Sequence, residues 1–336
     1  MVGGGVSWGA PPTNGRSAAV KALWLEDGAL RLLDNLAVPQ PGPEDALVRV
    51  ITAGVCSTDA ALMDGMYGFT GVPGHEFVGI VESGPAKLSG RRVVGEINIA
   101  CGACSACQTG QRKHCESRSA LGIRGRHGAF AEFLVLPAEN LHPVPDGIST
   151  EAAVFTEPLA AALDVFERAD VLETNRILVV GDGKLAQLVC RVLALTGASV
   201  DVLGRHQRKL EHLEGIVANS LNDSAIETKS YDLAVECTGN PSGLATALES
   251  LRPRGTLVMK STYPLMAAVD GTRVVVDELR LVGSRCGPFT EALSLLANHQ
   301  IDPTPLIDAR YPLAVAVEAL CRSRERGVLK VLIDVV

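Results

Sequence analysis

Four cysteines within fifteen residues constrain this chain more than any other feature. The stretch CGACSACQTGQRKHC places two, two and seven residues between Cys101, Cys104, Cys107 and Cys115. Thiols at such intervals are typical of a tetrahedral structural zinc site. The run is too short and polar to bury a core of its own, so metal binding would supply its folding free energy. The pattern predicts a zinc-stabilised lobe over residues 98–118, with a redox-active or disulfide-bonded loop as the alternative.

Composition and charge limit the class of protein. The 336 residues are 47% hydrophobic and 21% charged, with a formal net charge of −7. This length favours two domains, and the negative charge offers no basic surface for nucleic acid. No apolar run approaches the roughly 20 residues that span a bilayer, and the N-terminus lacks a signal-peptide core. We expect a cytoplasmic protein without nucleic-acid or membrane partners, and a disordered extension over residues 1–17.

Cys56 and His75 form a second candidate metal site. Cys56 lies in GVCSTD and His75 in GHEFVG, and a carboxylate stands close to each. A catalytic zinc takes three protein ligands and keeps one position open, so this pair would supply two. Asp59, one helical turn after Cys56, can accept the other ring N–H of His75 and fix its tautomer. Taken singly, each residue could instead be a buried apolar thiol or a satisfied core histidine.

These three motifs together resemble the zinc-dependent medium-chain alcohol dehydrogenases. The resemblance implies that Cys56 and His75 bind the catalytic zinc, and that the neighbouring Glu76 can enter its coordination sphere. It implies that the Thr58 hydroxyl hydrogen-bonds the substrate oxygen, and that the four-cysteine lobe binds a structural zinc. Many relatives carry a proton-relay histidine where this chain has Ala61. The relay would then run through Thr58 and a cofactor ribose hydroxyl to water, or through another group.

The third ligand of the catalytic zinc is expected at Glu157. It lies in Glu-Pro-Leu within residues 150–169, whose apolar pattern predicts one helix. Some members of the family place a cysteine here, whereas Glu-Pro-Leu resembles the polyol, sugar and threonine dehydrogenase branches. In those relatives the carboxylate binds directly or through water. The alternative is a solvated helix glutamate.

The second half of the chain begins with a nucleotide-binding pattern. RILVVGDGKLA predicts a buried strand, a glycine turn and a helix, which is the context that supports a Gly-x-Gly-x-x-Ala motif. Gly181 permits the tight turn, Gly183 lets the backbone approach a pyrophosphate, and Ala186 permits close helix–strand packing. The helix N-terminus offers N–H groups to the phosphates, which would include those of Lys184 and Leu185.

The end of the second strand of this unit bears on the choice of nucleotide. A cofactor with a free 2′-hydroxyl usually meets an acid there. By the family's spacing this position is Gly204, and Asp201 lies inside the strand. A missing acid followed by Arg205, Arg208 and Lys209 favours NADP(H) over NAD(H). A solvated basic helix start is the alternative, although cations there oppose the helix dipole unless an anion binds.

Further cofactor contacts follow from the resemblance. YDLAVECTG resembles the strand and turn over which the cofactor lies. The segment VVVDELRLVGSR is expected on the nicotinamide side and at subunit contacts. Lys330 matches the family's base that binds the pyrophosphate, with a surface lysine as the alternative. The residues assigned in this way are Cys237, Thr238, Gly239, Arg285 and Lys330.

The expected fold is α/β with two domains. A β-rich, GroES-like catalytic domain is predicted over residues 18–155 and 289–336, with strands that include 46–55 and 128–137. A doubly wound parallel-sheet (Rossmann) cofactor domain is predicted over residues 156–288.

The predicted function is an alcohol dehydrogenase that interconverts an alcohol, for example a polyol or sugar, and its carbonyl. It would use NADP(H) and two zinc ions per chain, in a homodimer or homotetramer as is common in the family. The alternatives are a reductase of the same fold that acts on C=C or C=N, and a non-catalytic zinc- and nucleotide-binding relative.

Overall fold

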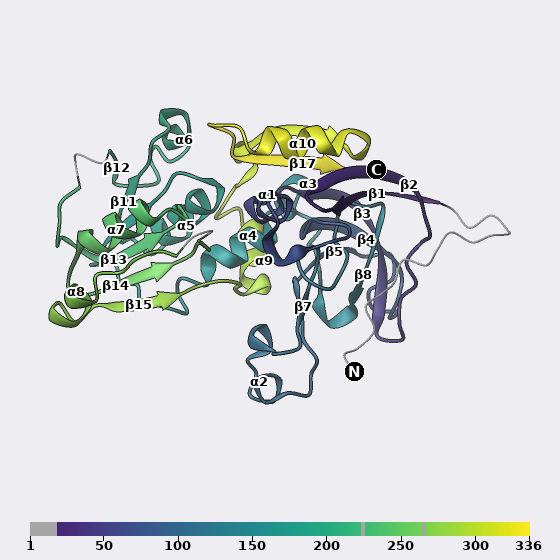
Figure 1. Cartoon of the computed structure of the whole chain (residues 1–336), viewed down its shortest axis with the longest axis horizontal. Coiled ribbons are helices and arrows are strands. Elements are labelled where there is room, and N and C mark those ends of the chain that lie inside the picture. Colours follow the sequence, from purple (N-terminus) through teal and green to yellow (C-terminus); the bar gives the residue numbers. More distant parts are fainter. Residues whose placement is uncertain (1–18, 223–225, 264–265) are drawn as a thin grey trace. The chain divides into compact units, whose positions relative to one another are not determined.

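The structure is a computed structural model that describes residues 19–222, 226–263 and 266–336. The expected N-terminal extension, residues 1–17, lies outside them. The chain divides into two compact units, which Figure 1 shows together. Unit 1 comprises the chain up to Glu157 and Leu293–Val336, and unit 2 comprises Pro158–Ala292. Within the described residues, no helix is long and apolar enough to cross a membrane.

Unit 1 is built on a seven-stranded sheet with the order β16-β17-β3-β4-β5-β9, in which β8 also pairs with β3. The C-terminal strand β17 pairs antiparallel with β3. The strands are β3 (Asp45–Gly54), β4 (Glu76–Ser83), β5 (Arg92–Gly95), β8 (Phe133–Pro137), β9 (Leu141–Pro143), β16 (Ile307–Pro312) and β17 (Lys330–Asp334).

Smaller elements complete unit 1. A hairpin joins β1 (Val20–Glu26) to β2 (Ala29–Leu36), and the short pair β6 (Asn98–Ile99) and β7 (Ser119–Ala120) forms the base of the cysteine lobe. The helices are α1 (Ser57–Met63), α2 (Ser105–Gln108), α3 (Thr150–Ala153) and α10 (Ala316–Ser323). The 3-10 turns are η1 (Met66–Gly68), η2 (Arg112–His114), η3 (Ala138–Asn140), η5 (Thr304–Leu306) and η6 (Leu313–Val315).

Alternation along β3 creates the core of unit 1. Every second residue from Ala46 is buried until the strand's last residues, which are all buried. An apolar face of this kind is what a half-buried antiparallel strand requires. Val48 and Val50 belong to one apolar cluster with Phe130 and Val331, so the core joins distant parts of the sequence.

Unit 2 contains a six-stranded, entirely parallel sheet with the order β12-β11-β10-β13-β14-β15. The order reverses between β10 and β13, which confirms the doubly wound expectation. The strands are β10 (Arg176–Val180), β11 (Ser199–Leu203), β12 (Asn219–Leu221), β13 (Tyr231–Glu236), β14 (Leu251–Met259) and β15 (Arg280–Gly283). The helices are α5 (Lys184–Ala194), α6 (Gln207–Glu211), α7 (Pro241–Ser250) and α8 (Gly271–Val276). Two further helices, α4 (Thr156–Leu163) and α9 (Phe289–Ala297), continue from one unit into the other.

The single helix predicted over residues 150–169 was wrong. The chain forms α3, breaks, and starts α4 at Thr156. The Ser149 hydroxyl caps α3 by accepting the Ala152 N–H at 3.1 Å. Pro158 has no N–H to continue a helix from α3 but fits the first turn of a new one. The break therefore places Glu157 in the first turn of α4.

The strand predicted over residues 128–137 begins only at Phe133. The N–H groups of residues 128–130 are used elsewhere, because they donate to the carbonyls of Val72, Gly74 and Pro73 at 2.7, 2.9 and 3.0 Å. This cross-link holds the segment directly before His75.

Gly128 is required for that approach. A Cβ at this position would lie 2.1 Å from the Gly74 carbonyl oxygen and 2.6 Å from the Pro73 carbonyl oxygen. Gly128→Ala is therefore expected to lower the free energy of unfolding by about 2–3 kcal/mol, as measured by urea denaturation. Gly147→Ala is the matched control, because no atom lies within 4 Å of the Cβ it would add. Equal stabilities of the two variants would contradict the proposed packing constraint.

Candidate metal and nucleotide sites

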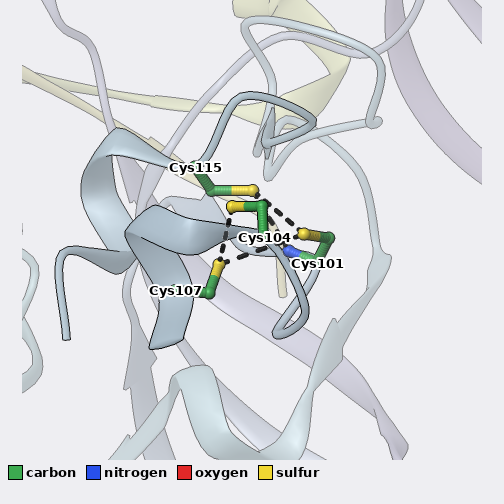
Figure 2. A group of neighbouring side chains, drawn as sticks. All are labelled: Cys101, Cys104, Cys107 and Cys115. Carbon is green, nitrogen blue, oxygen red and sulfur yellow. Dashed lines mark hydrogen bonds between the residues drawn. The ribbon is translucent and has the colours of Figure 1, made fainter. Parts of the chain in front are cut away.

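The four cysteine sulfurs converge at the end of the lobe, as Figure 2 shows. Cys101 Sγ lies 3.5 Å from Cys115 Sγ and 4.0 Å from Cys107 Sγ, and Cys104 Sγ lies 3.5 Å from Cys107 Sγ. A zinc ion with Zn–S distances of about 2.3 Å separates its tetrahedral sulfurs by about 3.8 Å. All nine cysteines, each within the described residues, are free thiols. The sulfur arrangement therefore fits a zinc ion and not a disulfide-bonded loop.

The backbone of the lobe favours thiolates. The N–H groups of Ala103 and Cys104 donate to Cys101 Sγ and lower the pKa of that thiol to about 6. The N–H group of Cys107 is the main cause of a lowered pKa at Cys104, whereas partial burial raises the pKa of Cys107 to about 11. A bound cation would remove the remaining protons, since coordination deprotonates a thiol.

The β3–β4 pairing assembles the second group of candidate ligands. Gly54, at the end of β3, stands opposite Glu76, at the start of β4. Cys56 follows β3 as the N-cap of α1, and His75 directly precedes β4. One ligand atom from each of Cys56, His75 and Glu76 lies within 4.8 Å of the other two. The register of two neighbouring strands thus brings together residues about 20 positions apart in the sequence.

Asp59 connects the two ends of this site. Its Oδ2 accepts the backbone N–H of Cys56 at 2.8 Å, and its Oδ1 lies 3.4 Å from His75 Nδ1. Burial by itself lowers the pKa of His75, but the Asp59 carboxylate and Cys56 thiolate outweigh it and raise that pKa well above its usual value. Among the described residues, neither Asp59 Oδ1 nor His75 Nδ1 has a hydrogen-bond partner, although both are buried. The two atoms face each other next to the ligand atoms of Cys56 and Glu76.

Glu76 is held by a contact that the sequence did not reveal. Its Oε2 accepts a hydrogen bond from Lys330 Nζ, and both side chains are 1% exposed. The ammonium also lies 5.3 Å from the centre of the Phe155 ring. A Cβ on Gly54 would lie only 2.4 Å from Glu76 Oε2, so the glycine leaves the space that the carboxylate occupies. Lys330 is thus not a surface lysine, and its expected pyrophosphate contact stays a prediction.

Thr58 and Glu157 occupy different positions relative to this group. Thr58 Oγ1 lies 3.7 Å from Cys56 Sγ and is partly exposed. Glu157 is partly buried in the first turn of α4 and does not belong to the close group of ligand atoms. The carboxylate in that group comes from Glu76. Glu157 as third ligand therefore stays a prediction.

The glycine turn of unit 2 lies between the ends of β10 and β13. Gly181 has φ +122°, and a Cβ on it would meet the Cys237 backbone at 3.2 Å and the Thr238 side chain at 3.2 Å. This is where the strand order reverses, which is the usual ligand crevice of such a sheet. The expected cofactor residues Gly183, Lys184, Leu185 and Ala186 begin α5 on one side, and Cys237, Thr238 and Gly239 follow β13 on the other.

Glu236, which the sequence analysis missed, shapes the turn after β13. Its buried Oε1 accepts the N–H groups of Thr238 and Gly239 at 2.5 and 3.1 Å, and Oε2 accepts the Tyr263 hydroxyl at 2.5 Å. A glutamate inside a buried apolar strand was the available signal, because a buried carboxylate must be hydrogen-bonded. Beside it, burial raises the pKa of the Cys237 thiol well above its usual value, so this thiol stays protonated.

The other residues expected to bind the cofactor, apart from Lys330, lie at the ends of β11 and β15. Gly204 is buried at the end of β11, whereas Arg205 and Arg208 are exposed and Lys209 is 9% exposed. Arg285 is exposed after β15, and its backbone N–H donates to the buried Asp164 at 2.9 Å.

Comparison with known proteins finds similarity to alcohol dehydrogenases. The alcohol dehydrogenase GroES-like domain family matches residues 42–146. L-threonine 3-dehydrogenase of Xanthomonas campestris pv. campestris (strain B100) is 29% identical over 286 residues, which cover 79% of this chain and 81% of that protein. L-galactonate-5-dehydrogenase of Escherichia coli (strain K12) is 27% identical, with 84% and 88% covered.

A solved structure extends the similarity to the whole fold. A zinc-binding dehydrogenase from Sinorhizobium meliloti 1021, bound to NADP, has a TM-score of 0.88 at 27% identity and covers 94% of this chain and 99% of its own. Over most of its length, this chain is similar to zinc-containing medium-chain alcohol dehydrogenases. Such a dehydrogenase depends on zinc and on NAD(P), and solved structures similar to this chain include complexes with NADP and with NADH.

The residues of the dehydrogenase fit two zinc ions. The four lobe sulfurs have the spacing of a closed tetrahedral site. Cys56 and His75 supply a sulfur and an imidazole beside a carboxylate, which is the donor set of a zinc site with an open position. Elemental analysis of the dehydrogenase is expected to find about two zinc ions per chain.

Substitution separates the two metal sites. Cys56→Ser is expected to remove about one zinc ion per chain and leave the melting temperature nearly unchanged. Cys107→Ser is expected to remove the other and to lower the melting temperature, because the lobe has little apolar core of its own. An unchanged zinc content in Cys56→Ser would contradict the assignment of the second site.

Proposed function

We propose that this chain interconverts an alcohol and its carbonyl by hydride transfer with NADP(H). The observation that carries the proposal is the Thr58 hydroxyl, 3.7 Å from Cys56 Sγ at the group formed by Cys56, His75 and Glu76. An alcohol that binds to a metal at this group must lose its hydroxyl proton when it is oxidised. The Thr58 hydroxyl lies close enough to the metal ligands to receive that proton. A sensor or structural relative would not need this hydroxyl.

Different residues would bind the metal, transfer the proton and orient the ligands. Cys56, His75 and a carboxylate would hold a zinc ion, which would lower the pKa of a bound hydroxyl, and a bound nicotinamide would supply the hydride chemistry. In the oxidation direction, the Thr58 hydroxyl would accept the substrate proton while passing its own proton outward, through a cofactor ribose hydroxyl to water. The reduction direction would reverse this relay. Asp59 holds the Cys56 backbone and faces the His75 ring, so it keeps both ligands oriented.

Two carboxylates are available as the third ligand. We propose Glu157 for that role, because Glu76 is already bound to Lys330. Glu76 would then exchange with Glu157 or with substrate only after weakening a buried ion pair. The Lys330 ammonium balances the charge of Glu76 and leaves the thiolate and the second carboxylate to balance the metal.

The nucleotide preference rests on the end of β11. Gly204 offers no acid to a ribose 2′-hydroxyl, and the exposed Arg205 and Arg208 follow it. Arginine binds phosphate groups by planar, charge-assisted hydrogen bonds. The NADP in the Sinorhizobium meliloti structure supports the same preference.

We propose a polar alcohol as substrate, of the polyol, sugar or hydroxy-acid kind. The support comes from the relatives, which are named for threonine and galactonate. The low aromatic content, 4%, agrees with a pocket that has few ring contacts for an apolar substrate. We also propose that the enzyme acts in the cytoplasm as a homodimer or homotetramer, as family members commonly do.

Thr58→Ala is expected to lower kcat for alcohol oxidation by about 100-fold, because it removes the group that accepts the proton. Thr58→Ser keeps a hydroxyl and is expected to retain most of the activity. The measurement is absorbance at 340 nm with a panel of polyols, sugars and hydroxy acids. Full activity of Thr58→Ala would favour a reductase that acts on C=C or C=N, and no turnover of any substrate would favour a non-catalytic relative.

Arg205→Ala is expected to lower kcat/KM for NADPH by about 10- to 100-fold, because a charge-assisted contact to the 2′-phosphate is lost. The value for NADH is expected to change little. Arg326→Ala is the control, because Arg326 is also exposed but lies far along the chain in unit 1. A wild-type preference for NADH, unchanged in Arg205→Ala, would overturn the NADP(H) assignment.

A further inference from the structure

Asp182 lies between the two glycines of the nucleotide turn, and its carboxylate is directed at the end of β11. Its Oδ2 accepts three hydrogen bonds: from the backbone N–H of Arg205 at 2.7 Å, from the backbone N–H of His206 at 2.8 Å and from His206 Nδ1 at 2.9 Å. Lys209 Nζ lies 3.9 Å from Oδ1. One side chain thus ties the first turn of unit 2 to the whole segment that follows the second strand.

Asp182 also occupies the space that a side chain at position 204 would need. A Cβ on Gly204 would lie 2.8 Å from Asp182 Cβ and 3.1 Å from Asp182 Oδ2, and 2.6 Å from a methyl group of Leu210. An acid at the end of β11 cannot coexist with this arrangement. In this chain the carboxylate of the region therefore stands in the first turn and not at the end of the second strand.

Oδ2 of Asp182 is fully occupied by these hydrogen bonds. Burial by itself raises the pKa of Asp182, but the hydrogen bonds from Arg205 and His206 and the charge of Lys209 outweigh it and lower that pKa. The side chain is therefore ionised at neutral pH. Three donors on Oδ2 exceed the two lone pairs of a carboxylate oxygen, so this oxygen has no capacity for a ribose hydroxyl.

The hydrogen bond to Asp182 fixes the orientation of the His206 ring. A carboxylate oxygen only accepts, so Nδ1 of His206 carries the proton that points at Asp182. The imidazole side chain is 37% exposed, and its second nitrogen, Nε2, is the one that can meet a ligand. Arg205, held through its backbone N–H, extends an exposed guanidinium from the same segment.

We propose that Asp182 is a positioning residue for the 2′-phosphate of NADP(H). It fixes the backbone at residues 204–206 so that Arg205 and His206 face the phosphate, and by its position it excludes the acid that would select NAD(H). This inference rests on the proposed NADP(H) preference. A carboxylate that bound the ribose itself would act in the opposite direction and favour NAD(H).

The test measures binding of two cofactor fragments to the full-length, zinc-loaded chain by calorimetry. The fragments are 2′,5′-ADP, which carries the 2′-phosphate, and ADP, which carries a free 2′-hydroxyl. Asp182→Asn keeps one acceptor oxygen but loses the negative charge, so its hydrogen bonds to residues 205 and 206 weaken. It is expected to weaken 2′,5′-ADP binding by about tenfold or more and ADP binding little. Asp201→Asn is the matched control, because Asp201 is a buried, hydrogen-bonded aspartate of the neighbouring strand. It is expected to leave the ratio of the two affinities unchanged.

The possible results distinguish the positioning role of Asp182 from the NADP(H) preference of the chain. If the wild-type chain prefers 2′,5′-ADP and Asp182→Asn loses that preference, the positioning role holds. If the preference persists in Asp182→Asn, or if ADP is weakened equally or more, the positioning role is overturned and the NADP(H) assignment stands. A wild-type preference for ADP overturns both.

A pair of variants tests the exclusion independently of Asp182→Asn. Gly204→Asp alone is expected to weaken both fragments, because its side chain meets Asp182 and Leu210. Gly204→Asp combined with Asp182→Gly is expected to bind ADP more tightly than 2′,5′-ADP, because the carboxylate then stands at the strand end. Identical fragment affinities in the single and double variants would overturn the spatial exclusion.

Discussion

The antiparallel register of β3 and β4 is the constraint on which the metal site of unit 1 depends. It sets Gly54 opposite Glu76, and so places Cys56 and His75 at the same end of the sheet. A slip of one residue would turn every side chain of β4 to the other face. Asp59 then links the Cys56 backbone to the His75 ring, and the segment around Gly128 holds the residues before His75. The site is thus a product of strand pairing and of the two loops that strand pairing aligns.

The buried pair between Glu76 and Lys330 extends this dependence to the C-terminus. Lys330 begins β17, which pairs with β3 at the end that carries Gly54. Removing one partner of such a pair leaves an unpaired buried charge, which costs about 3–5 kcal/mol. Closing the sheet with the last strand therefore also neutralises the carboxylate beside Cys56 and His75. Stability and metal chemistry share one contact.

Unit 2 uses buried carboxylates in a comparable way. Asp182, after β10, accepts the N–H groups of Arg205 and His206 in the loop after the neighbouring strand β11. Glu236, at the end of β13, accepts the N–H groups of Thr238 and Gly239 in the loop after its own strand. Both carboxylates accept hydrogen bonds from backbone N–H groups. They therefore fix the loops of the expected nucleotide site, and their bonded oxygens are not strong acceptors for the nucleotide. The cations of the same region, Arg205 and Arg208, remain exposed. This division suits an anionic ligand.

Local patterns in the sequence predicted the four-cysteine lobe and the strand–turn–helix around Gly181 and Gly183, because spacing within one turn or loop restricts what such residues can form. The resemblance to a known family predicted that Cys56 and His75 lie together. The sequence could not show that a Glu76 oxygen lies within 4.8 Å of the Cys56 and His75 ligand atoms, that Lys330 is buried against Glu76, or that Asp182 fills the space at Gly204. Nor did it show that the helix around Pro158 breaks, because the apolar pattern continues across the break. Only the tertiary structure decided these points, because each contact joins residues far apart in sequence through strand register and side-chain packing.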